Sequence, residues 1–357
     1  MGGGALGLSA ALRLAEEGRD VVLREKRTLG AGATHKAAGI LSTMTWSDEE
    51  YALIAETRGA VGELISLGLC EGHLEAKDCW RPVTSIMVAN GGDSRLDQIF
   101  NRLNRFTEEP ERFQGRSAQA QVPGVEIGPQ EEILVAQEDG VLDAGALVET
   151  LRRRAIAEGV RIEEGVEPTW DADRTVIAAG AWTRNILAAR GATLPIRAFR
   201  TQLATLEMGE VPIVHDLVHG FYARPESETA FLAGDGTRLV DHNPDDYDES
   251  TDTLFRDHIA SAVVKRFTGG GEAKWRTGWA GLCVATPDRH PMCGPVPGLE
   301  DVYVLTGDNG FGLMRCLALG DRLADTLRGR HHAWLDPGRF GALDDFVMRE
   351  GFGDLGA

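Results

Sequence analysis

Residues 2–7 read Gly-Gly-Gly-Ala-Leu-Gly, which fits the spacing G-x-G-x-x-G. In that pattern Gly2 makes a tight turn, Gly4 lets the backbone approach a pyrophosphate, and Gly7 lets a helix pack closely on a strand. Residues 5–17 are rich in Ala and Leu, which predicts a helix directly after the turn. The free N–H groups and the positive dipole end of that helix would face the phosphates.

A short apolar run, Asp20-Val21-Val22-Leu23-Arg24, follows the predicted helix and indicates a buried parallel strand. Glu25 stands at the C-terminal tip of this strand, 18 residues after Gly7. A carboxylate in that place accepts hydrogen bonds from ribose hydroxyls and repels the 2′-phosphate of NADP. Glycine-rich turns alone are common, but turn, helix, strand and acid in this order predict a dinucleotide site in a Rossmann-like α/β fold.

The rest of the chain alternates predicted helices and strands. Residues 107–130 are polar and contain three prolines, which indicates loop or edge structure. Residues 196–240 hold several short strand-like runs and predict an antiparallel sheet. Residues 241–252 read as a solvated acidic loop without the EF-hand spacing of a calcium site. The other predicted helices are residues 50–70, 94–106, 144–158 and 312–328, and the other predicted strands are residues 160–162, 175–179 and 302–305.

The composition excludes several classes of partner. The chain has 357 residues, with 55 Asp and Glu against 37 Lys and Arg, and its formal charge is −18. Because phosphate binding needs a basic surface, this charge argues against nucleic acid and against anionic membrane surfaces. We find no apolar run near the roughly 18 residues of a spanning helix and no secretory signal pattern, so we expect a cytoplasmic protein without a membrane span.

Cysteine and lysine usage adds two further expectations. The five cysteines are odd in number and form no C-x-x-C pair, so neither a disulfide framework nor a zinc site is indicated. A reducing compartment fits this pattern best. Five of the 37 basic residues are Lys and 32 are Arg, which fits either an acidic proteome adapted to high salt or a GC-rich genome.

Further segments resemble the D-amino-acid oxidase-like FAD-dependent oxidoreductases, a group that includes glycine oxidase, sarcosine oxidase and the dimethylglycine dehydrogenases. Residues 29–41 resemble the second flavin-contact segment of that family, and residues 306–313 resemble its C-terminal flavin closure. The similarity runs in order from residue 2 to about residue 328. The other similar segments are residues 139–143, 175–183, 222–225, 234–237, 280–282 and 286–291.

The resemblance implies a Rossmann-like FAD-binding domain with an antiparallel-sheet substrate domain, of the glutathione-reductase-like, D-amino-acid oxidase type. We expect the FAD domain to comprise residues 1–75, 135–190 and 285–345, and the substrate domain residues 76–134 and 191–284. It also implies a set of FAD-binding residues. These are Gly2, Gly4, Leu6, Gly7, Glu25, Lys26, Ala33, Thr34, His35, Lys36, Gly39, Val166, Ala179, Gly180, Trp182, Gly307, Asp308, Asn309, Gly310, Gly312 and Leu313.

Two departures from the family concern the Rossmann part. The family has a buried first strand directly before the glycines, and this strand is missing here, which we expect to expose two neighbouring strands and unseat the glycine turn. Either the start was placed too far downstream or the polypeptide binds FAD poorly, and the intact later motifs favour the first. The stretch between Val166 and Thr175 is also too short for the β-meander that the family usually carries there.

Two further departures concern the substrate grip. Glycine oxidase-like members hold the substrate carboxylate with an Arg whose place is taken here by Cys283, and a thiol cannot replace a bidentate guanidinium. Sarcosine oxidases use a Lys whose place is taken by Met314. Arg315, next to it, is therefore our candidate for the anion grip, with a surface Arg that caps the last helix as the alternative. Tyr222 is our candidate for a hydroxyl donor at the roof of the pocket, with ordinary strand packing as its alternative.

Covalent flavin attachment is not expected. The attachment His of dimethylglycine dehydrogenase-like members corresponds to Lys36, with His35 one residue earlier, and the attachment Cys of sarcosine oxidase corresponds to Gly281. We therefore expect non-covalent FAD, with His35 and Lys36 near the flavin rim. We interpret His290 as a turn residue, and Cys283, Cys293 and Cys316 as small buried residues.

The family chemistry predicts oxidation of the C–N bond of a small amino acid or N-methyl amino acid, with hydride transfer to flavin N5. An enzyme acting on a 2-hydroxy acid or a polyol phosphate is the second hypothesis, and a truncated non-catalytic paralogue or partner subunit is the third. Since residues 238–243 contain no Lys to activate oxygen, a dehydrogenase that passes electrons to an acceptor protein or a quinone is favoured over an oxidase. The oligomeric state is left open.

Overall fold

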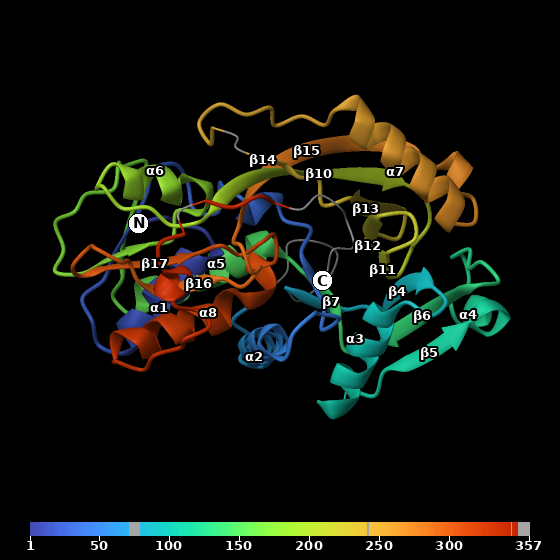
Figure 1. Cartoon of the computed structure of the whole chain (residues 1–357), viewed down its shortest axis with the longest axis horizontal. Helices are drawn as coiled ribbons and strands as arrows, with labels where there is room; N and C mark the ends of the chain where they lie inside the picture. Colours follow the sequence, from blue (N-terminus) through green and yellow to red (C-terminus); the bar gives the residue numbers. More distant parts are fainter. Residues whose placement is uncertain (71–78, 107, 241–242, 344, 349–357) are drawn as a thin grey trace.

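The computed structural model describes residues 1–70, 79–106, 108–240, 243–343 and 345–348. Figure 1 shows two parts side by side, one built of helices around short sheets and one built on a long sheet. The expected domain boundary near residue 75 lies outside the described residues. Within the described residues, no helix is both long and apolar enough to cross a membrane.

The first part has a Rossmann-like arrangement of helices on short parallel strands. Strand β1 pairs in parallel with β8, and β9 pairs in parallel with β17, which also pairs with β16. Helix α1 packs between α5 and α8 over a shared apolar core. The bounds are α1 Ala5–Glu16, β1 Val22–Glu25, α5 Ala144–Ala157, β8 Arg161–Glu164, β9 Thr175–Ile177, α6 Thr183–Ala188, β16 Met292–Pro295, β17 Val302–Thr306 and α8 Gly312–Leu327. Helix α6 and strand β16 were not predicted, and the other elements match the predicted ones within a few residues.

Met1 and Gly2 occupy the seam between the two short sheets. The amide of Gly2 donates to the Arg24 carbonyl at 2.9 Å, while the amide of Ala178 donates to the Met1 carbonyl at 2.8 Å. A Cβ added to Gly2, whose φ is +101°, would lie 2.4 Å from the Ala178 oxygen. The predicted unseating of the glycine turn is wrong, because these contacts hold the turn in place.

The second part is a long, mostly antiparallel sheet, which confirms the sheet predicted from residues 196–240. Its strands run in the order β14-β10-β13-β12-β11-β4-β6-β5, and β15 also pairs with β10. Strand β5 and helix α4 form within the stretch predicted to be loop or edge structure. The bounds are β4 Ser85–Asn90, β5 Glu111–Gln114, α4 Gly115–Gln121, β6 Glu131–Ala136, β10 Arg197–Glu207, β11 Ile213–Asp216, β12 Phe221–Ser227, β13 Ala230–Gly234, β14 Leu239–Val240 and β15 Lys274–Ala285.

The two faces of this sheet have different neighbours. Helix α7 (Thr253–Arg266) covers one face, where Val88 and Val214 join its apolar core. On the opposite face Met87 packs against α3 (Ser94–Arg105). Alternation along each strand therefore places odd-numbered residues of β4 and β11 on the α3 side, away from α7.

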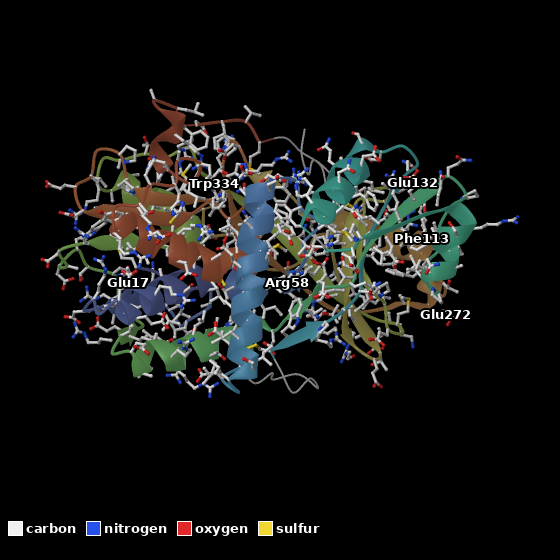
Figure 2. All side chains as sticks on the ribbon, turned by 90° about the horizontal axis from the view of Figure 1, so that it is seen from below. Glu17, Arg58, Phe113, Glu132, Glu272 and Trp334 are labelled. Carbon is white, nitrogen blue, oxygen red and sulfur yellow. A yellow bond between two sulfur atoms is a disulfide. The ribbon has the colours of Figure 1, made fainter. Side chains whose placement is uncertain are left out.

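Helix α2 (Asp48–Ser66) crosses the molecule between the two parts, and Figure 2 shows it in the centre with Arg58 on it. Arg58 Nη2 pairs with Glu108 Oε1 at 2.7 Å, beyond the end of α3. On the other side, Arg322 of α8 pairs with Glu56 at 2.6 Å. Ser47 caps the start of α2 by accepting a hydrogen bond from the Glu50 amide.

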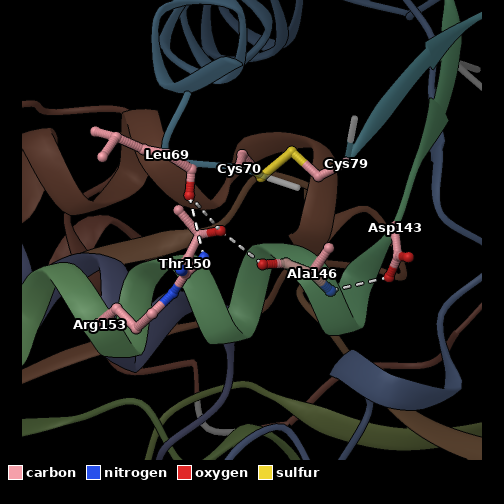
Figure 3. Close-up of a disulfide and its surroundings, with 7 residues drawn as sticks. All are labelled: Leu69, Cys70, Cys79, Asp143, Ala146, Thr150 and Arg153. Carbon is pink, nitrogen blue, oxygen red and sulfur yellow. Dashed lines mark hydrogen bonds between the residues drawn. A yellow bond between two sulfur atoms is a disulfide. The ribbon is translucent and has the colours of Figure 1, made fainter. Parts of the chain in front are cut away.

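A disulfide between Cys70 and Cys79 corrects the expectation drawn from the odd cysteine count. It joins the segment after α2 to the start of a small sheet in which β7 (Gly140–Leu142) pairs with β2 (Ile40–Leu41) and β3 (Trp80–Pro82). Figure 3 shows Thr150 of α5 donating to the Leu69 carbonyl beside the bond, at 3.3 Å. Of the three free cysteines, Cys293 and Cys316 are buried as expected and Cys283 is half-buried.

The Cys70–Cys79 bond should contribute to stability. Cross-linking residues nine positions apart limits the unfolded chain, so the double variant C70A/C79A should lose about 2–3 kcal/mol of unfolding free energy. Urea unfolding of both proteins, with and without a thiol reductant, measures the loss. The reductant should lower the urea midpoint of the parent protein and leave that of the double variant unchanged. Equal midpoints for the parent protein in both conditions would contradict this stabilisation.

Candidate active site

One cavity of about 1100 Å³ extends from the start of α1 to the face of the long sheet opposite α7. Most sequence-predicted site residues line it. They are Gly2, Gly4, Leu6, Glu25, Lys26, Ala33, Thr34, Lys36, Gly39, Ala179, Gly180, Trp182, Tyr222, Asp308, Asn309, Gly310, Gly312 and Leu313. Its lining does not include Gly7, His35, Val166, Gly307 or Arg315. Contact of the lining residues with FAD stays a prediction.

The start of α1 fits a bound phosphate. The N-cap residue, Gly4, has no side chain to cap this helix, and the first turn carries no acidic residue. Thr34 Oγ1 accepts a hydrogen bond from the Ala5 amide at 3.1 Å and lies 3.1 Å from the place of a Cβ on Gly4. The turn is therefore held from one side while unsatisfied N–H groups and the helix dipole remain for an anion.

Glu25 lies at the tip of β1, as the sequence predicts. Its Oε2 accepts a hydrogen bond from the Gly3 amide at 2.7 Å, and its Oε1 accepts one from the Arg27 amide at 2.8 Å. The carboxylate therefore braces the glycine turn, and its remaining lone pairs can accept ribose hydroxyls. Val166 lies outside the lining, and the neighbouring Glu167 and Pro168 line the cavity in its place.

The loop of residues 307–312 borders the cavity at the start of α8. Its backbone takes positive φ at Gly307 (+74°), Asn309 (+53°) and Gly310 (+88°). The Asn309 side chain holds this shape, because its Oδ1 accepts from the Thr286 amide at 3.0 Å. Gly312 has no room for a side chain, since an added Cβ would lie 2.4 Å from Asp308 Oδ2. Burial raises the pKa of the Asp308 carboxyl.

Lys36 points from the cavity wall to the acidic loop. Its Nζ donates to the Tyr247 hydroxyl at 2.7 Å and pairs with Glu249 Oε2 at 2.9 Å. Trp182 Nε1 donates to Asp245 Oδ1 of the same loop at 2.8 Å. His35 is exposed and outside the cavity lining, so of the two residues expected near the flavin rim only Lys36 lines the cavity.

Tyr222 of β12 lies on the face of the long sheet opposite α7. Its hydroxyl lies 2.5 Å from the place of a Cβ on Gly234, so only glycine fits beneath it. Thr201 of β10 hydrogen-bonds the phenol, and burial raises the pKa of Tyr222 far above its usual value. A neutral phenol held in this way can donate a hydrogen bond to a ligand. Cys283 lines the same cavity, and burial likewise raises the pKa of its thiol, so the thiol is protonated.

His215 is a cavity residue that sequence reasoning missed. It lies on β11 directly opposite Tyr222, and it faces the cavity because its neighbour Val214 packs on the α7 side. Its Nε2 is buried without a hydrogen-bond partner, and burial lowers the pKa of the ring to about 4. The imidazole is therefore neutral at pH 7. A lone histidine in an apolar strand matches no motif. Only the register of β11 with β12, which places His215 opposite Tyr222, identifies it as a cavity residue.

The expectation for Arg315 as an anion grip needs correction. Its guanidinium is fully buried, lies outside the cavity lining and pairs with Glu50. Arginines 27, 238 and 289 line the cavity instead. Arg238 directly precedes β14, which pairs with β10 of the sheet that carries Tyr222. The family's motif positions do not include these three arginines, so the motifs did not predict them. His290 is not just a turn residue, since its Nδ1 contacts Glu50 Oε1 at 2.9 Å.

The buried His215 should make stability depend on pH. With a folded pKa of about 4 and an unfolded pKa of about 6.5, the unfolded chain binds more protons between these values. Unfolding free energy should therefore fall by up to about 3 kcal/mol as pH drops from 6.5 to 4. H215F should show a smaller fall in urea unfolding at pH 7 and pH 4.5, whereas H331F, at a well-exposed histidine, should behave like the parent. An equal fall in H215F and the parent would contradict this role.

Comparison with known proteins agrees with this geometry. Residues 1–326 match the family described as FAD dependent oxidoreductase. The chain is 23% identical to glycine oxidase of Pseudomonas putida, over 92% of this chain and 93% of that protein. It is 24% identical to the mitochondrial sarcosine dehydrogenase of Mus musculus, over 91% of this chain. It spans about two fifths of the length of the sarcosine dehydrogenases that it matches.

Solved structures show the same fold. L-proline dehydrogenase from P. horikoshii superposes with a TM-score of 0.84 at 19% identity, over 95% of this chain and 96% of that chain. Glycine oxidase from Geobacillus kaustophilus superposes with a TM-score of 0.77 at 20% identity, over 93% of this chain and 94% of that chain. These likenesses confirm the expected architecture. Because the family match covers most of its length, the chain belongs to the FAD-dependent oxidoreductases of the D-amino-acid oxidase type.

Proposed function

We propose that this protein binds FAD non-covalently and oxidises the C–N bond of a small amino acid or N-methyl amino acid. The observation that carries the proposal is the continuity of the cavity, which joins the glycine turn at the start of α1 to Tyr222 on the sheet. The α1 turn would hold the pyrophosphate, Glu25 a ribose, and residues 307–312 would border the ring system. FAD, when bound, supplies the acceptor for the substrate hydride.

The residues on the sheet would bind and orient the substrate. Arg238 supplies a cation for a carboxylate, in the role that Cys283 cannot fill. The Tyr222 phenol donates a hydrogen bond, and the neutral His215 opposite it adds no charge. Such a site fits an amine that enters unprotonated, so that positioning rather than a strong base promotes the reaction.

The contacts of Lys36 favour transfer of electrons to a separate acceptor protein or quinone. Lys36 lines the cavity, but its ammonium is engaged by Tyr247 and Glu249. An oxygen-activating role over the flavin would need that ammonium to leave both partners. We therefore expect dehydrogenase activity to exceed oxidase activity.

The visible absorption spectrum tests the proposal. The purified protein, or protein mixed with FAD, should show two flavin bands, and denaturation should release the yellow cofactor into the supernatant. Bands that shrink on anaerobic addition of sarcosine, L-proline or glycine would identify an amine substrate, whereas bleaching by 2-hydroxy acids alone would favour the alternative hypothesis. A protein that stays colourless with added FAD would refute the assignment.

Replacing Tyr222 should weaken catalysis without removing the cofactor. Y222F deletes one hydrogen bond to the substrate, so kcat/KM should fall by about tenfold to a hundredfold while FAD affinity is unchanged. Steady-state kinetics with an artificial electron acceptor measures the fall. Y303F on β17, which lies outside the cavity lining, is the matched control and should keep the parent activity. Equal activity of Y222F and Y303F would remove Tyr222 from the site.

A further inference from the structure

A fully buried ion pair lies directly behind the wall of the active-site cavity. Glu50 in the first turn of α2 and Arg315 in the first turn of α8 are each 0% exposed, and Arg315 Nη1 lies 2.5 Å from Glu50 Oε2. Neither residue lines the cavity. The two charges are compensated within the protein, with His290 Nδ1 contacting the other Glu50 oxygen.

Arg315 connects this pair to the loop of residues 307–312. Its Nη2 donates to the Asp308 carbonyl at 2.6 Å and its Nε donates to the Phe311 carbonyl at 3.3 Å. Its guanidinium carbon also lies 5.3 Å from the centre of the Phe311 ring. Asp308 and Phe311 both line the cavity, so one cation holds both ends of the segment that faces a ligand.

The start of α2 touches the same loop a second time. Trp46, just before the helix cap, packs its ring 4.8 Å from that of Phe311, and both side chains line the cavity. The backbone between the Asp308 and Phe311 carbonyls takes positive φ at Asn309 and Gly310. Loss of Arg315 would remove the donor that holds the carbonyls on either side of these two residues.

Stability alone does not account for this arrangement. A buried ion pair often adds no more to stability than apolar residues of similar volume, because both charges lose their hydration. Helices α2 and α8 are also joined at the surface by Glu56 and Arg322 at 2.6 Å. Apolar residues could not donate hydrogen bonds to the two loop carbonyls, and they could not place a fixed pair of charges beside the cofactor site.

We propose that Glu50 and Arg315 are positioning residues that hold residues 308–311 against the flavin ring and set the local charge there. This inference rests on the proposed FAD site. Arg315 provides positive potential, which stabilises the reduced anionic cofactor, and Glu50 offsets it. Arg315 by itself would then raise the reduction potential of the flavin, and Glu50 by itself would lower it. Asp308 and His290 are the other titratable groups beside the pair.

The midpoint potential of bound FAD tests the sign of each effect. E50Q leaves the Arg315 cation uncompensated and should raise the potential, whereas R315M leaves the Glu50 anion and should lower it. The double variant E50Q/R315M should return toward the parent value. In R315M the two loop carbonyls lose their donor, so the dissociation constant of FAD should rise roughly tenfold. R315K keeps the charge with fewer donors, and should weaken FAD binding without lowering the potential.

The surface pair provides the matched control on the same two helices. E56Q and R322M should leave both the potential and the FAD dissociation constant at the parent values. Shifts of equal sign in E50Q and R315M, or shifts no larger than those of E56Q and R322M, would overturn the inference while FAD binding by the parent stands. If R315M does not fold, E50Q and R315K carry the test. A parent protein that binds no FAD would overturn the proposed function as well.

Discussion

The close approach of three backbone segments in the Rossmann part determines where the groups predicted to bind FAD lie. Residues 1–7 pass between the end of β1 and the segment after β9, so tightly that a Cβ on Gly2 would lie 2.4 Å from the Ala178 oxygen and one on Gly3 would lie 3.0 Å from Glu25 Cβ. This contact leaves the amide groups at the start of α1 facing the cavity. It also brings Glu25 and Ala179 to the same wall. Without it, the two short sheets would share no hydrogen bonds through Met1 and Gly2.

Local patterns predicted this region well because its chemistry is local. The glycine spacing, the helix and the acid at the strand tip are short-range signals, and the structure places them as expected. Tyr222 could also be predicted, since a family motif carries it. The wall of the cavity formed by residues 307–312 was predicted from the resemblance to the family, although Gly307 itself is not among the lining residues.

The remaining features depend on contacts between distant segments. Glu50 and Arg315 sit near opposite ends of the chain, and neither carries a motif that identifies the other. The Cys70–Cys79 bond depends on where α2 ends and β3 begins, which a count of cysteines does not reveal. His215 is visible only once β11 is in register with β12, because periodicity alone does not say which face of a strand borders a cavity.

Helix α2 is fastened on both of its sides, and this has a consequence for how molecules reach the cavity. Arg102 of α3 pairs with Asp48 at 2.8 Å on one side, and Arg322 of α8 pairs with Glu56 on the other. A hinge rotation of the two parts would have to break the ion pairs on at least one side of α2. Motion of the segment around Tyr247, which is tied to Lys36, Trp182 and Arg200, would leave the ion pairs of α2 intact. We therefore expect substrate entry and product release to follow the kinetics of a loop rather than those of a domain closure.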